Sequence, residues 1–281
     1  MELISIPIIG WCNGVNRIFK EVEKAVKNDP KTKFYCFKEL VHNKASNGLL
    51  KKYKVKVIKD LSVIKNKENS VILLQAHGTT KEFINKLENK KIKYIDLTCK
   101  FIKFNESKLL EKQKNGYKTY FIGNSLHQET IATSSKFIKT KIIDVFSWKK
   151  TIFPKNKKCF VTNQTTLNSD KINEVKKYFS NKNIYFNNGC CPEILLRQKN
   201  LRNVIKSIDL LLVIGDKNSN NAIELTNIAK ENNKKFYLLN SPRQITKKKL
   251  LKSNKIGICT SASAPKTLYD QIYKKLVSIA N

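Results

Sequence analysis

Short apolar runs recur along the 281-residue chain, and most of them end in a few polar residues. The runs that have the length and composition of buried strands are residues 2–9, 33–37, 71–74, 93–97, 120–122, 160–162, 210–214 and 256–259. Apolar residues at helical spacing lie between them and predict helices after residue 14, over 81–87, over 101–114, over 195–208 and after Pro265. Strands that alternate with helices predict parallel sheets flanked by helices.

One unit occurs three times in this pattern: a cysteine, a helix, and two strands that each end in a polar tip. The copies begin at Cys12, Cys99 and Cys191. They predict an α/β fold of three pseudo-symmetric lobes with mainly parallel sheets: 13–98, 99–190, and 1–12 plus 191–281. A run of unrelated β-α-β units is the alternative. Ligands bind at the carboxyl ends of parallel strands, so lobes around a pseudo-threefold axis would direct their tips into one cavity.

The net charge of +33 raises the question of a nucleic-acid partner. Only four of the 55 basic residues are arginines, the side chain that phosphate and base readers usually exploit. Abundant lysine, asparagine and isoleucine favour a composition bias over a specific nucleic-acid interface. A lysine-rich binder without enzymatic activity remains an alternative, and the surface would attract an acidic protein.

The seven cysteines follow no export signal that the sequence shows, so disulfides are not expected. No apolar run approaches the roughly 20 residues of a membrane span, and we expect a soluble, cytoplasmic protein. Cys36, Cys159 and Cys259 lie in apolar runs and fit a core. Cys12, Cys99 and Cys191 stand where a strand or loop passes into a helix. Without a C-x-x-C pair zinc is disfavoured, whereas a cubane iron–sulfur cluster held by three cysteines would leave one iron open.

The three histidines, His42, His77 and His127, all follow expected strands. An imidazole beside an oligo-anion is driven toward its charged form, which donates from both ring nitrogens. Ser219, Asn221 and Ser263 add further donors at other tips. This set is typical of a diphosphate site.

Nine short motifs in order then carry a resemblance: GWCNGV, VHN, QAHG, DLTC, HQE, NQTTL, CC followed by RQ, GDKNSNN and SASAP. The chain resembles the 4-hydroxy-3-methylbut-2-enyl diphosphate reductases. The resemblance implies a three-lobed fold around a central 4Fe–4S cluster, with Glu129 as proton source and Thr165 beside the substrate alcohol. It implies that Cys12, Cys99 and Cys191 hold the cluster. The diphosphate pocket that it implies consists of His42, His77, His127, Ser219, Asn220, Asn221 and Ser263.

The activity that the resemblance implies is reductive dehydroxylation of this allylic diphosphate to isopentenyl and dimethylallyl diphosphate, the last step of the non-mevalonate isoprenoid pathway. The electron donor would be an acidic ferredoxin or flavodoxin. Another three-cysteine 4Fe–4S enzyme, a quinolinate synthase-like dehydratase, is the alternative.

The chain departs from the family pattern at several positions. Lys100 replaces a proline, Glu193-Ile194 replaces an alanine-threonine pair, and Asn220 replaces a serine. Cys190 competes with Cys191 for the third ligand position, and the spacing to Arg197-Gln198 favours Cys191.

Overall fold

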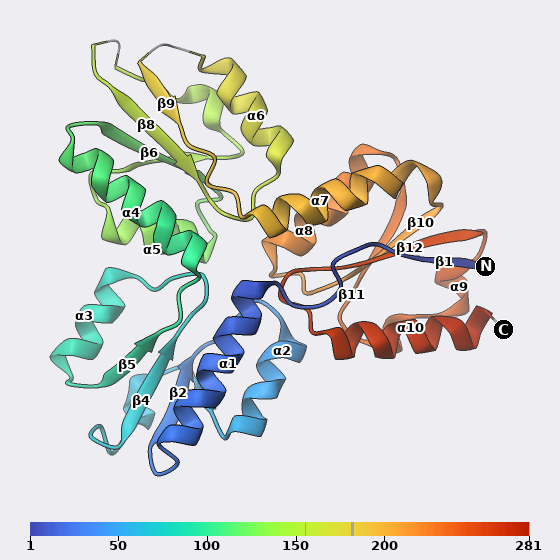
Figure 1. The fold of residues 1–281 in the computed structure, drawn as a ribbon, viewed down its shortest axis with the longest axis horizontal. Helices are drawn as coiled ribbons and strands as arrows, with labels where there is room; N and C mark the ends of the chain where they lie inside the picture. Colours follow the sequence, from blue (N-terminus) through green and yellow to red (C-terminus); the bar gives the residue numbers. More distant parts are fainter. Residues whose placement is uncertain (155, 181–182, 281) are drawn as a thin grey trace. The chain divides into compact units, whose positions relative to one another are not determined.

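A computed structural model describes residues 1–154, 156–180 and 183–280 (Figure 1). Residues 155, 181–182 and 281, which fall within the second and third expected lobes, lie outside the described residues. The chain forms two compact units. The first comprises Met1–Arg17, Val41–Tyr53 and Pro192–Asn281, and the second comprises Ile18–Leu40 and Lys54–Cys191.

The first unit contains one four-stranded parallel sheet, sheet A, in the order β1-β12-β10-β11. Its strands are β1 (Glu2–Ser5), β10 (Leu210–Ile214), β11 (Lys235–Leu239) and β12 (Lys255–Thr260). The helical segments are α2 (Lys44–Gly48), η1 (Leu49–Tyr53), α7 (Pro192–Val204), η4 (Ile205–Ser207), α8 (Asn220–Glu231), η5 (Pro242–Gln244), α9 (Lys247–Leu250) and α10 (Lys266–Ala280).

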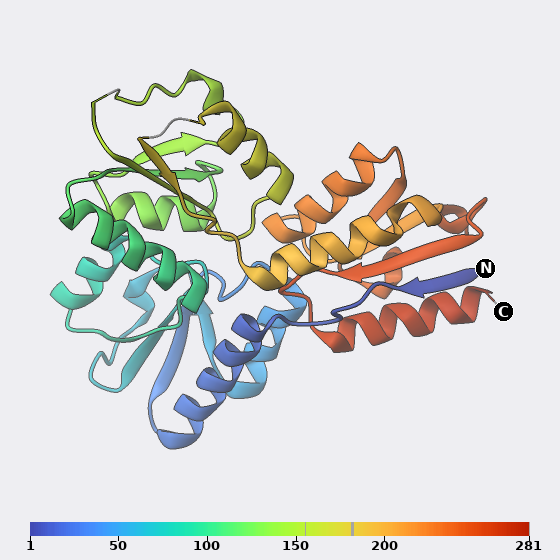
Figure 2. The same ribbon diagram turned by 45° about the horizontal axis from the view of Figure 1, so that its top comes forward.

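Sheet A is buried on both faces because α10 packs against one face and α7 and α8 against the other (Figures 1 and 2). The central strand shows the consequence. Leu210, Leu212 and Ile214 join the core under α10, whereas Leu211 and Val213 join the core under α7 and α8. A strand covered on both sides reads as a continuous apolar run, which is why residues 210–214 were predictable.

The second unit contains two further parallel sheets. Sheet B has the order β3-β2-β4-β5 and sheet C the order β7-β6-β8-β9. The strands of sheet B are β2 (Lys33–Phe37), β3 (Lys56–Ile58), β4 (Ser70–Leu74) and β5 (Lys93–Asp96). Those of sheet C are β6 (Lys118–Gly123), β7 (Lys141–Asp144), β8 (Cys159–Asn163) and β9 (Ile184–Phe186). The helical segments are η2 (Leu61–Val63), α3 (Lys81–Asn89), α4 (Lys100–Lys114), α5 (Gln128–Lys136), η3 (Trp148–Lys150) and α6 (Ser169–Tyr178). Helix α1 (Asn13–Asn28) contributes its residues up to Arg17 to the first unit and the rest to the second.

All three sheets share one spatial order of strands. Across each sheet the strands lie in the order second, first, third, fourth, counted along the chain within the lobe. Sheet A follows this order as β11-β10-β12-β1, with the amino-terminal strand in fourth place. The predicted fold class, an α/β fold with three parallel-sheet lobes, is therefore confirmed. The strands of each sheet fall within one expected lobe, but the compact units divide the chain differently, so the lobe boundaries at 13–98, 99–190 and 1–12 plus 191–281 stay a prediction.

The first strand is shorter than the predicted 2–9, since β1 ends at Ser5. Pro7 has no N–H to continue a ladder, and Ile8 and Gly10 adopt positive φ angles of 70° and 88°. The chain therefore turns toward Cys12 immediately after the strand.

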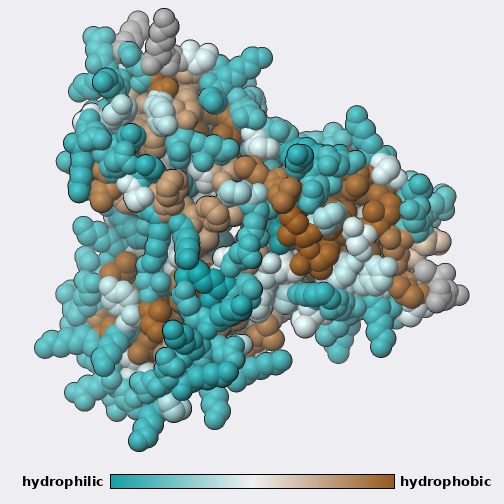
Figure 3. Space-filling model, viewed as in Figure 1, coloured by the Kyte–Doolittle hydropathy of each residue, from teal (hydrophilic) through white to brown (hydrophobic). Residues whose placement is uncertain are grey.

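The surface is mainly hydrophilic on the face shown in Figure 3, as the lysine content leads one to expect. Among the described residues, no helix has both the length and the apolar character needed to cross a membrane.

Candidate active site

The three cysteines singled out by the sequence share one backbone arrangement. Each N–H donates a 2.9 Å hydrogen bond to a carbonyl oxygen just beyond the third strand of a lobe. Cys12 N–H donates to Ala262 O after β12, Cys99 N–H to Ala76 O after β4, and Cys191 N–H to Thr165 O after β8. Each of these bonds lies within one compact unit. The repeat in the sequence is thus a repeat of one loop geometry.

Each cysteine also stands immediately before a long helix. Cys12, Cys99 and Cys191 precede α1, α4 and α7, and Val15 N–H donates to Cys12 Sγ at 3.4 Å. The amino end of a helix carries a partial positive charge, which favours a negatively charged sulfur. The thiolate is the form of cysteine that binds metals. None of the seven cysteines, all of which lie in the described part of the chain, forms a disulfide bond.

The side chain of Cys190 is held by residues at and just after the end of β8. Asn163 Nδ2 donates to Cys190 Sγ at 3.0 Å, and Cys190 Sγ lies 3.8 Å from Leu167 O. Asn163 is the last residue of β8, and Leu167 lies four residues beyond it. These contacts tie Cys190 to its own lobe, which favours Cys191 as the third ligand.

The turn before Cys190 is fixed as well. Asn163 Oδ1 accepts from Gly189 N–H at 3.0 Å, and Asn105 Nδ2 donates to Gly189 O at 2.8 Å. A Cβ atom on Gly189 would lie only 2.5 Å from Asn163 O, so glycine is required there. Asn105 and Asn163 are functional candidates to which the sequence reading gave no role. Asn105 lies in an amphipathic helix without a motif, whereas Asn163 is the first residue of NQTTL.

The second unit brings together a buried carboxyl group and a hydroxyl. Glu129 is 1% exposed, and its two oxygens accept from Thr165 N–H at 2.8 Å and from Thr165 Oγ1 at 2.7 Å. Burial raises the pKa of Glu129 to about 7, although both hydrogen bonds from Thr165 oppose the shift and the charge of Glu106 adds to it. A large share of Glu129 is therefore protonated at neutral pH.

His127 stands at the start of α5, next to this pair. Its Nδ1 accepts from Glu129 N–H at 3.2 Å and caps the helix, which leaves Nε2 as its donor. The ring of His77 meets the ring of His127 edge-on, with centroids 5.4 Å apart. The second unit thus holds His77, His127, Glu129 and Thr165 close together.

Gln164 is the residue before Thr165, and the sequence reading gave it no role. Its Oε1 accepts from Asn124 N–H at 3.0 Å and from Thr130 Oγ1 at 3.4 Å, and its Nε2 donates to Thr166 Oγ1 at 2.9 Å. The amide is fully buried and links the tips of β6 and β8. Its place in NQTTL was the only signal that could have found it.

The first unit holds the remaining predicted donors. Ser263 Oγ donates to His42 O at 3.2 Å, and Ser46 Oγ donates to Ser263 O. Trp11 Nε1 donates to Ser46 Oγ at 2.8 Å and so connects this loop to the turn before Cys12.

Ser219 and Asn221 lie at the amino end of α8. The Ser219 hydroxyl caps this helix by accepting from Ala222 N–H, and Asn220 is its first residue. Asn221 Oδ1 accepts from Ala262 N–H at 2.8 Å, which joins the tips of β10 and β12. Asn221 Nδ2 is buried and has no partner within the described residues. An unsatisfied buried donor at a helix amino end fits an anionic ligand.

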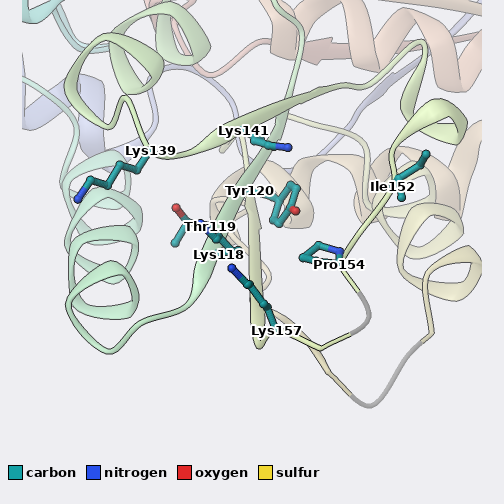
Figure 4. A pocket seen from close by; sticks show the side chains of 8 residues that line it. All are labelled: Lys118, Thr119, Tyr120, Lys139, Lys141, Ile152, Pro154 and Lys157. Atoms are coloured by element: carbon teal, nitrogen blue, oxygen red, sulfur yellow. The ribbon is translucent and has the colours of Figure 1, made fainter.

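A separate cavity of about 460 Å³ opens at the amino ends of the strands of sheet C (Figure 4). Four lysines line it: Lys118, Lys139, Lys141 and Lys157. The candidate residues of the second unit follow the carboxyl ends of the strands, and none of them lines this cavity.

Three parallel-sheet lobes whose third strands each anchor a cysteine at the start of a helix define a class of three-lobed, three-cysteine α/β proteins. The model of one family, described as LytB protein, matches residues 4–277. The chain therefore belongs to the LytB protein family, and the resemblance inferred from the motifs is confirmed.

Relatives with named activities are similar over nearly the whole chain. A 4-hydroxy-3-methylbut-2-enyl diphosphate reductase of Wigglesworthia glossinidia brevipalpis is 30% identical over 95% of this chain and 87% of its own length. One of Fusobacterium nucleatum subsp. nucleatum is 28% identical over 99% of this chain, which spans only 34% of that relative's length. The solved structure of the E-1-hydroxy-2-methyl-but-2-enyl-4-diphosphate reductase from Plasmodium falciparum has a TM-score of 0.89 at 28% identity and covers 98% of this chain and 88% of its own.

Proposed function

We propose that this chain is a 4-hydroxy-3-methylbut-2-enyl diphosphate reductase that forms isopentenyl and dimethylallyl diphosphate, the last step of the non-mevalonate isoprenoid pathway. In this reaction the allylic C–O bond breaks, a C–H bond forms, and the oxygen leaves as water. The balance requires two electrons and two protons for each substrate molecule. The observation that carries the proposal is the threefold cysteine arrangement in a LytB family member.

The donor set fits a 4Fe–4S cluster. Three thiols, each held by its own backbone at the positive end of a helix, are the ligands that iron–sulfur clusters prefer. We assign this role to Cys12, Cys99 and Cys191. When bound, the cluster supplies the electrons one at a time and offers one iron that no cysteine occupies.

The donors that we assign to the substrate diphosphate are those that the family resemblance implies. They include His42, His77, His127 and Ser263. The orphan amide of Asn221 supplies a further donor, and Ser219 and Asn220 offer donors beside it at the start of α8. A diphosphate held at several points fixes the alcohol for reaction.

Glu129 and Thr165 handle the proton that leaves with the hydroxyl. With its pKa near 7, Glu129 is an acid that keeps its proton in a large share of the molecules at neutral pH. In the ionised form it accepts from Thr165 Oγ1 at 2.7 Å. A protonated Glu129 can instead donate its proton to Thr165 Oγ1. Thr165 then donates its own hydroxyl proton to the substrate oxygen.

The electron donor is an acidic ferredoxin or flavodoxin in this proposal, and we place the reaction in the cytoplasm. The net charge of +33 supports the donor assignment, because opposite charges steer association. Electron transfer from such a donor should slow steeply as salt rises. A rate independent of salt would contradict the assignment.

The test of the function is anaerobic purification followed by turnover with the allylic alcohol diphosphate and a chemical reductant. We expect about four irons for each chain and two electrons for each product molecule. Glu129→Gln should keep the iron and lose most of the turnover, whereas Glu111→Gln, on the surface of α4, should keep both. A protein that binds no iron after reconstitution would refute the proposal. Iron without electron consumption would favour a dehydratase instead.

A further inference from the structure

Glu193 differs from the family pattern, and its carboxylate has a specific partner. Both of its oxygens accept from Asn13 N–H, at 3.0 and 3.1 Å. Asn13 is the first residue of α1 and directly follows Cys12, while Glu193 is the second residue of α7 and lies two residues after Cys191. One side chain therefore connects the starts of two helices, each of which begins directly after a candidate cluster ligand.

The same helix holds the other side of the Cys12 turn. Arg197 lies four residues after Glu193, on the same side of α7. Its guanidinium donates to Ile8 O at 2.7 Å and to Gly10 O at 2.8 Å. It also donates to Thr260 O at 3.0 Å and so includes the end of β12. The peptides before Cys12 are bound by Arg197 and the peptide after it by Glu193.

The contact suits both helix ends. The amino-terminal N–H groups of a helix lack partners within the helix, and an acidic side chain both satisfies one of them and matches the positive helix end. Asn13 N–H is one of these amino-terminal groups in α1. Glu193 itself lies in the first turn of α7, where an acidic side chain is also favourable. Pro192 begins α7 without requiring a partner for its nitrogen.

We propose that Glu193 is a positioning residue that fixes the Cys12 turn for cluster binding. The proposal rests on the assignment of Cys12 as a cluster ligand. The carboxylate holds the first peptide of α1, and this determines where the Cys12 thiolate points. An alanine at this position would lack the atoms to make this bond.

The test compares Glu193→Ala and Glu193→Gln with Glu231→Ala, which removes an exposed glutamate at the end of α8. In the metal-free protein, hydrogen–deuterium exchange of a peptide spanning residues 11–17 should be faster in Glu193→Ala. In the reconstituted protein, the same variant should release iron to a chelator about fivefold faster, as loss of a helix cap would give. Glu193→Gln retains one acceptor oxygen and should restore most of both properties, and Glu231→Ala should match the unsubstituted protein.

Two results would overturn the proposal. One is exchange and iron release in Glu193→Ala that match the unsubstituted protein. The other is a Glu193→Gln variant as impaired as Glu193→Ala, since a hydrogen-bonding role requires rescue by the amide. If the unsubstituted protein binds no cluster, the proposed function fails separately, and the exchange measurement still decides whether Glu193 holds the turn.

Discussion

Replacing Glu129 with glutamine should change how the stability of the fold depends on pH. The pKa of this carboxyl group rises from 4.5 to about 7 on burial. The folded protein therefore binds a proton that the unfolded chain has released, and it does so across the interval between those two values. The stability contributed by protonated Glu129 is fully present below pH 4.5 and is lost as the pH rises through 7.

The size of the effect follows from the shift. One pKa unit corresponds to about 1.4 kcal/mol, so the full shift corresponds to about 3 kcal/mol of unfolding free energy. Glutamine stays neutral and keeps both contacts, because its Oε1 can accept from Thr165 N–H and its Nε2 can donate to Thr165 Oγ1. Glu129→Gln should match the unsubstituted protein below about pH 4.5 and exceed it by about 3 kcal/mol above about pH 7.

Urea titrations of the metal-free protein and the variant, from pH 5 to pH 8, measure this difference. Other ionisable groups are common to both proteins, so subtracting the two curves isolates Glu129. Glu111→Gln is the control, because hydrogen bonds from Lys108 and Lys112 lower the pKa of exposed Glu111. Its difference curve should have the opposite, small slope. A difference between Glu129→Gln and the unsubstituted protein that stays constant with pH would refute the raised pKa and remove Glu129 as a neutral acid.

Three further predictions follow from the contacts. Cys191→Ala should bind little iron under anaerobic reconstitution, whereas Cys190→Ala should keep most of it; equal losses would contradict the choice of Cys191. Asn221→Asp keeps the acceptor for Ala262 N–H but replaces the orphan donor with an oxygen, so the KM for the diphosphate substrate should rise roughly tenfold. An unchanged KM would show that Asn221 does not bind the substrate. Cys99→Ser should lose iron yet unfold at the urea concentration of the metal-free protein. Cys99→Pro, at a φ of −58° that proline accepts, loses the N–H that anchors the turn and should cost about 1–3 kcal/mol more; equal stability of the two would argue against the anchor.

The sequence predicted the central strands well because they are buried on both faces and read as continuous apolar runs. The sequence did not predict the edge strands β3, β7, β9 and β11. They are short, and lysine, aspartate or tyrosine interrupts most of them, as in KVI, KIID and IYF. Their strand character comes from parallel pairing with an inner neighbour rather than from a pattern of their own.

The candidate site was predictable where residue type carries the chemistry. Cysteines at helix starts, histidines after strands and Glu129 all gave such signals. The carbonyls of Ala76, Thr165 and Ala262, which anchor the cysteines, gave none, because every residue has a carbonyl oxygen. The buried state of Glu129 was also outside the reach of the sequence, since it depends on how α5 packs against the tip of β8.

The cysteines are anchored by backbone hydrogen bonds. This explains why the three copies of the repeat share a pattern of elements but few identical residues. Each contact needs only a strand tip, a cysteine amide and a helix that starts directly afterwards, so neighbouring side chains are free to diverge. The departures at Lys100 and at Glu193-Ile194 fall in the first turns of α4 and α7, after the anchored peptide. Neither touches the hydrogen bond that holds its cysteine. A side chain at such a position can therefore make a contact of its own, as Glu193 does by accepting from Asn13 N–H, without changing the loop that presents the thiol.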